Sequence, residues 1–192
     1  MQAANFYGFA IGNENKKICR HINDDVKSIA WYINTYDKSA LTEIIQTADL
    51  VIVVSDLDEY SQASEVKLIL DLAQTLNVPV LIYAIDKMKL AFQHSQQAKS
   101  STQLSSFEKT AIIIPIDEHT LINTPIMIEY FMPHRLDKDY SVLSINLIIA
   151  LKALVEPITQ QALIGVDFAD YQLALACKGY YQTSLYTAED LT

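Results

Sequence analysis

The stretch Asp49-Leu50-Val51-Ile52-Val53-Val54 decides the fold class, because its five consecutive apolar residues leave no polar side to face water. A strand of this kind is buried on both faces, as strands are in the parallel sheets of α/β proteins. Helical patterns flank it in the sequence, around residues 39–47 and again over 61–77, where apolar residues recur at helical spacing. A buried strand between two helices predicts a parallel sheet that is covered by helices.

The rest of the chain continues this alternation. Further strands are expected at residues 6–11, 28–34, 78–84 and 111–115, and further helices at roughly 16–23 and 141–157. We expect a polar helix or loop over residues 92–106 and irregular structure over 121–139. The pattern predicts a three-layer α/β fold, a Rossmann-like, mainly parallel sheet with helices on both faces, and a single domain over residues 1–192. Folds of this class bind ligands at the carboxyl ends of their strands.

The composition and charge of the chain disfavour several classes of function. The formal net charge of −9 and the scattered lysines disfavour a nucleic-acid partner, because phosphate binding needs a basic face. The longest uninterrupted apolar runs are strand-sized, so no membrane span is expected. Without a signal-peptide pattern, and with Cys19 and Cys177 far apart in sequence, we expect a cytoplasmic protein with free thiols. The four histidines have no metal-ligand spacing, so no metal site is expected.

The segment Ile164-Gly165-Val166-Asp167-Phe168-Ala169-Asp170 follows the long apolar helix expected at residues 141–157. It resembles the synergy loop of FtsZ, the cell-division GTPase of the tubulin superfamily, whose pattern is Asn-hydrophobic-Asp-Phe-Ala-Asp. Other segments resemble the same family in the same order, so the resemblance covers nearly the whole chain. These segments are Ile33-Asn34-Thr35, Ala48 to Val53, Ile112 to Asp117, Lys178-Gly179-Tyr180 and Ala188-Glu189-Asp190. The resemblance implies the FtsZ/tubulin nucleotide-binding domain, without the second, C-terminal subdomain of that family.

The resemblance also implies catalytic roles for Asp167 and Asp170. In FtsZ the synergy loop of one subunit meets the γ-phosphate of GTP on the next, and its two aspartates orient or polarise the attacking water. Carboxylates suit that role because they accept a proton or help to hold a cation near phosphate. The alternative is structural, since aspartate is also a preferred cap for a helix that begins near Tyr171.

The phosphate-binding loop departs from the family pattern. FtsZ has Gly-Gly-Gly-Thr-Gly-Thr-Gly there, whereas this chain has Asp56-Leu57-Asp58-Glu59-Tyr60-Ser61-Gln62-Ala63-Ser64. Glycines let backbone N–H groups approach phosphate, and three carboxylates oppose it. The acids have a structural use at the N-terminus of the following helix, where they offset its dipole and act as an internal substitute for phosphate. A cation site built from Asp56, Asp58 and Glu59 is the rival interpretation.

Other positions match the nucleotide contacts of the family only in part. The residues expected to line this degenerate nucleotide site are Gly8, Gly12, Asn34, Ser61, Tyr140 and Ser144. Tyr140 falls where an aromatic ring stacks on guanine, and Ser144 and Ile145 fall where Asn and Asp read the edge of the base. Isoleucine forms no hydrogen bond with a base, so guanine specificity should suffer.

Three functions follow from these observations. The first is a non-enzymatic FtsZ-like protein, a pseudoenzyme, which acts through contacts with a protein partner, either genuine FtsZ or itself, and needs no cofactor. The second is a divergent, self-assembling GTPase that binds GTP with Mg²⁺; a basic residue supplied by Lys16 or Lys17 would favour it. The third is a binding or sensing domain outside cell division, with the tyrosines near the C-terminus as a partner surface.

Overall fold

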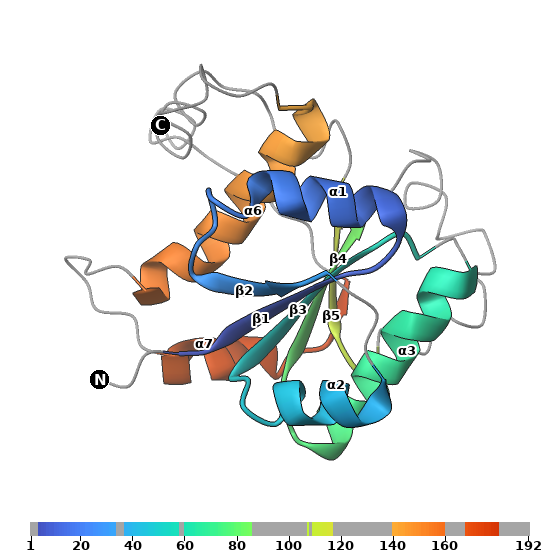
Figure 1. The fold of residues 1–192 in the computed structure, drawn as a ribbon. Coiled ribbons are helices and arrows are strands. Elements are labelled where there is room, and N and C mark those ends of the chain that lie inside the picture. The colour runs from blue at the N-terminus through green and yellow to red at the C-terminus, as the bar shows by residue number, and fades with distance from the viewer. Residues whose placement is uncertain are drawn as a thin grey trace, which may run out of the picture.

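The fold is taken from a computed structural model, which describes residues 4–33, 37–57, 60–85, 107, 109–116, 140–159 and 168–180 (Figure 1). In chain order these residues form β1 (Phe6–Ala10), α1 (Asn13–Ile22), β2 (Ile29–Tyr32), α2 (Lys38–Ile45), β3 (Leu50–Ser55), α3 (Tyr60–Thr75), β4 (Val80–Ile85), β5 (Ile112–Ile116), α6 (Val142–Thr159), α7 (Phe168–Leu175) and β6 (Gly179–Tyr180). The two segments expected to be polar or irregular, 92–106 and 121–139, lie outside the described residues.

The described strands form one six-stranded sheet in the order β2-β1-β3-β4-β5-β6, and each of its neighbouring pairs is parallel. The apolar run Leu50 to Val54 supplies most of β3, which lies between β1 and β4 and has every residue buried. This arrangement confirms the predicted α/β fold. A parallel strand in the middle of a sheet is buried on both faces, which explains its continuous apolar run.

Helices cover both faces of the sheet and complete three layers (Figure 1). α1 and α6 pack on the face that includes Phe6, Leu50 and Ile52. α2 and α3 pack on the other face, against Val51 and Val53. Neighbouring residues of one strand thus belong to opposite cores, because side chains alternate along a strand.

The long helix α6 is apolar on most sides because it is buried. Its length and mean hydropathy of 1.7 would suit a membrane-crossing helix, but nine of its residues are buried inside the protein. The Tyr83 hydroxyl, from β4, donates a hydrogen bond of 3.0 Å to the Ala150 carbonyl in the middle of α6. α6 is therefore a core helix packed on the sheet.

The element boundaries differ from the expected ones at a few places. α1 begins at Asn13, three residues earlier than expected, because Gly12 takes a positive φ of 87° and lets the chain turn directly into the helix. Pro79 lies just before β4, and its carbonyl accepts a hydrogen bond from the Val51 N–H. α3 ends close to Asn77, as expected, and that residue adopts the left-handed conformation with φ 56°.

Candidate functional site

The two loops that follow β1 and β3 lie side by side at the carboxyl edge of the sheet. β1 and β3 are paired neighbours, and the Ile11 N–H donates a hydrogen bond of 2.9 Å to the Val54 carbonyl just before the loops diverge. α1 begins after the first loop and α3 after the second. This is the place where folds of this class bind ligands.

A cluster of buried polar side chains fills the space between these loops. Six polar or charged residues are buried in the described part of the chain, and four of them gather here: Asn15, Ser55, Asp56 and Gln62. A buried polar group is costly unless it is hydrogen-bonded, so such a cluster needs an internal explanation.

Gln62, in the first turn of α3, supplies that explanation. Its side-chain oxygen Oε1 accepts hydrogen bonds from the Asp56 backbone N–H at 3.0 Å, from Asn15 Nδ2 at 3.2 Å and from Ser55 Oγ at 3.3 Å. Asn15 also donates to the Ile11 carbonyl at 2.7 Å. One amide oxygen thus joins both loops and both helix N-termini, with a backbone N–H, a hydroxyl and an amide as its donors. We call this arrangement the Gln62 cluster: Gln62, Asn15, Ser55 and Asp56.

Gly12 is part of the same arrangement, since a Cβ at Gly12 would lie about 2.5 Å from Cδ and Nε2 of Gln62. The positive φ of Gly12 is a second, independent reason for glycine at this position. The close approach of Gln62 and the positive φ both require a glycine at this position. A bound phosphate group is not needed to explain it.

Gly8 is also explained by packing. It lies inside β1, where a Cβ would come within 2.5–2.7 Å of the Trp31 ring and within 2.9 Å of Ile29 Cγ2 on the neighbouring strand β2. The absent side chain of Gly8 therefore makes room for the indole of Trp31.

The acidic stretch that follows β3, Asp56 to Glu59, is described only at its first acid. Asp56, a member of the Gln62 cluster, is buried at 5% exposure, while Asp58 and Glu59 lie outside the described residues. Within the described ranges, no group of three or more His, Cys, Asp or Glu residues could hold a metal ion. The cation site suggested for Asp56, Asp58 and Glu59 stays a prediction.

The structure does not bring Tyr140 and Ser144 to these loops. The Tyr140 hydroxyl donates a hydrogen bond to the Asp25 carboxylate, and its ring contacts the His21 ring edge-on at 4.8 Å. His21 and Asp25 lie at and beyond the C-terminal end of α1, whose ten residues separate them from Gly12 by about 15 Å.

Ser144 is buried and its hydroxyl lies 2.9 Å from that of Ser141. Its N–H donates to Ser141 Oγ at 3.2 Å, so Ser141 caps the N-terminus of α6. The pair has a structural role at the start of this helix. Ile145, the next residue, is 1% exposed and belongs to the core on the α1 and α6 face.

The remaining predicted residues lie apart from one another. Ser61 is exposed in the first turn of α3, next to Gln62. Asp170 is exposed in the first turn of α7, which Figure 1 places by the amino ends of the strands, at the opposite edge of the sheet from the Gln62 cluster. Asn34 and Asp167 lie outside the described residues.

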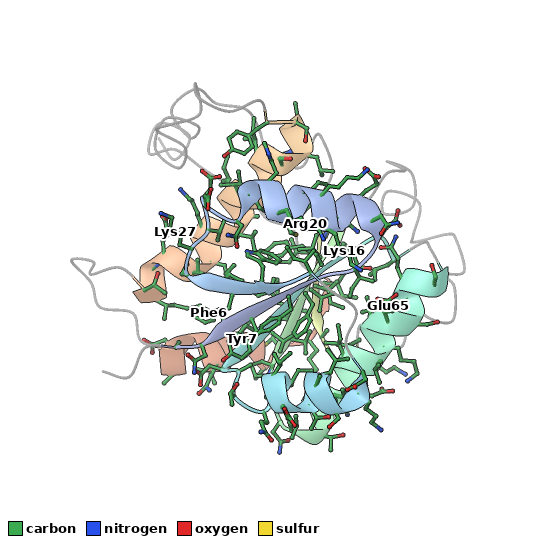
Figure 2. All side chains as sticks on the ribbon, viewed as in Figure 1. Phe6, Tyr7, Lys16, Arg20, Lys27 and Glu65 are labelled. Carbon is green, nitrogen blue, oxygen red and sulfur yellow. The ribbon has the colours of Figure 1, made fainter. Side chains whose placement is uncertain are left out.

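The basic residues of α1 are close to the loop in sequence. Figure 2 shows Lys16 and Arg20 along α1 and Glu65 on α3. Lys17 forms an exposed ion pair of 2.7 Å with Glu14, whereas Lys16 is half-buried.

Cys19, on the inner side of α1, is fully buried, and burial raises the pKa of its thiol far above the ordinary range. A thiol in that state is a core group rather than a nucleophile.

The hydrogen-bond donors around Gln62 Oε1 indicate whether a nucleotide phosphate fits between the two loops. A phosphate between the two loops would need the donors that Gln62 Oε1 already engages, and Asp56 adds an acidic residue to one of these loops. The described residues fit the Gln62 amide at this position and do not fit a phosphate group.

Sequence reasoning missed Gln62 as the central residue of the site. The signal was present in the apolar stripe of α3, because Gln62 lies four residues before Val66 and seven before Ile69, in register with the buried face. A polar residue in register with a buried helical stripe indicates a buried hydrogen-bonding role.

Comparison with models of known protein families gave no match, and comparison with curated protein sequences gave none. Solved structures do match. An empty FtsZ dimer of M. jannaschii matches with a TM-score of 0.63 and 13% identity, over 93% of this chain and 62% of that chain. A tryptophan-to-tyrosine mutant of M. jannaschii FtsZ matches with a TM-score of 0.58 and 14% identity, over 92% of this chain and 64% of that chain. The chain thus spans slightly less than two thirds of the length of these structures, and it has an FtsZ/tubulin-like fold.

Proposed function

We propose that this chain is an FtsZ-like protein that acts through protein contacts in cell division or filament regulation, and that it works in the cytoplasm without a nucleotide cofactor. The observation that carries the proposal is Gln62 Oε1, which accepts hydrogen bonds from three donors between the loops after β1 and β3. In the family that the sequence resembles, this is the neighbourhood of the GTP phosphates. A protein that fills this position with its own side chain has no need of phosphate to hold the two loops together.

The two ends of the sheet then have different roles. The carboxyl edge is closed by the Gln62 cluster, whereas Asp170, at the amino edge, is exposed in the first turn of α7. A protein of this kind docks through its amino edge on the nucleotide-binding end of a genuine FtsZ. Its own carboxyl edge offers no nucleotide site to the next subunit. Such asymmetry caps or tunes a filament instead of extending it.

A divergent GTPase that binds GTP with Mg²⁺ is the second candidate, and the exposure of Asp170 favours it. A catalytic aspartate supplied across a subunit interface must be accessible, and Asp170 is. In that case Asp167 and Asp170 act on the nucleotide of a neighbouring subunit. Gln62 would then have to leave its three donors before a nucleotide could bind, so binding would be coupled to rearrangement of the loops.

Calorimetric titration of GTP, GDP and GTPγS into the purified chain, with and without Mg²⁺, separates the two candidates. We expect no heat of binding up to millimolar nucleotide. Magnesium-dependent binding in the micromolar range would refute the preferred proposal and support the GTPase.

Co-sedimentation with authentic FtsZ filaments tests the proposed contact directly. We expect the chain to pellet with the filaments and the Asp170→Ala variant to pellet less. Glu43→Ala, which removes an exposed acid from α2 on another part of the surface, is the matched control and should pellet like the unmodified chain. If the unmodified chain stays in the supernatant at every filament concentration, the docking proposal is wrong and a function outside cell division is favoured.

A further inference from the structure

We draw no further inference here: the strongest candidate, the groove of about 310 Å³ between the C-terminal half of α3 and α7 at the amino edge of the sheet, carries none because nothing in the structure shows what covers it.

Discussion

Replacing Gln62 tests the central feature of the site, because it removes one acceptor from three donors at once. Gln62 is 7% exposed, and its Oε1 takes hydrogen bonds from Asp56 N–H, Asn15 Nδ2 and Ser55 Oγ. Gln62→Ala deletes the acceptor and leaves a small space. Gln62→Leu deletes the acceptor but keeps most of the volume, so that water cannot replace it.

The expected cost of Gln62→Ala follows from two terms. A buried backbone donor left without an acceptor costs about 1–3 kcal/mol, and loss of the one buried methylene that alanine lacks, Cγ, costs about 0.8 kcal/mol. A water molecule that enters the vacated space offsets part of this loss. We expect the free energy of unfolding to fall by about 2–4 kcal/mol, a large share of the ~5–15 kcal/mol typical of a domain.

Urea unfolding followed by circular dichroism and by fluorescence of Trp31, the single tryptophan, measures the effect. With a slope of about 2–3 kcal/mol per molar urea, the midpoint should fall by roughly 1 M. Gln74→Ala is the matched control: it makes the same substitution on the same helix, at an exposed side chain, and should change stability by less than about 0.5 kcal/mol.

Comparison of the two substitutions separates hydrogen bonding from packing. If the hydrogen-bond acceptor is what matters, Gln62→Leu destabilises at least as much as Gln62→Ala, because the leucine excludes the replacement water. If Gln62→Leu is as stable as the unmodified chain, Gln62 serves only to fill space. That result, or a Gln62→Ala variant as stable as the Gln74→Ala control, would refute the reasoning.

The other predictions concern the glycines and the buried thiol. Gly8→Ala should destabilise by about 1–3 kcal/mol through overpacking and should alter the fluorescence of Trp31, since the new Cβ would lie 2.5 Å from the indole; unchanged fluorescence and stability would contradict the packing role. Gly12→Ala should cost about 1–3 kcal/mol because of the positive φ, and part of this loss should disappear in the Gly12→Ala/Gln62→Ala double variant, where the clash is relieved; a double-mutant cycle in urea detects the coupling, and strict additivity would argue against the contact. Burial raises the pKa of Cys19 in the folded protein, so above about pH 8.5 only the unfolded chain releases this proton, and stability should fall with rising pH by up to about 1.4 kcal/mol per unit; the loss should be shallower in Cys19→Ala, and parallel pH profiles would contradict it.

The strands were the most predictable part of the molecule. The apolar runs of β1, β3 and β4 identified them within one or two residues, because a strand buried on both faces must be apolar at every position. The start of α1 was less predictable. It depends on the backbone conformation of Gly12, and the sequence shows a glycine without showing its φ.

The candidate site was predictable in location but not in content. The parallel order of the strands placed a site at the loops after β1 and β3, where the structure has the Gln62 cluster. The sequence pointed to the acidic residues of the loop after β3 as the candidate site residues. The residue that joins the two loops is instead an uncharged glutamine. The resemblance to FtsZ predicted a nucleotide contact for Tyr140, yet this residue packs against the C-terminal end of α1.

By itself, the sequence determined the α/β class, the identity of the buried strands and the absence of glycine from the loop after β3. These features follow from local pattern, since alternation, apolar runs and missing glycines are all visible within a few neighbouring residues. Only the tertiary structure decided which side chain fills the space between the loops. Asn15 and Gln62 are 47 residues apart and meet only because β1 and β3 pair side by side, and no local pattern encodes a hydrogen bond between the helices that follow them.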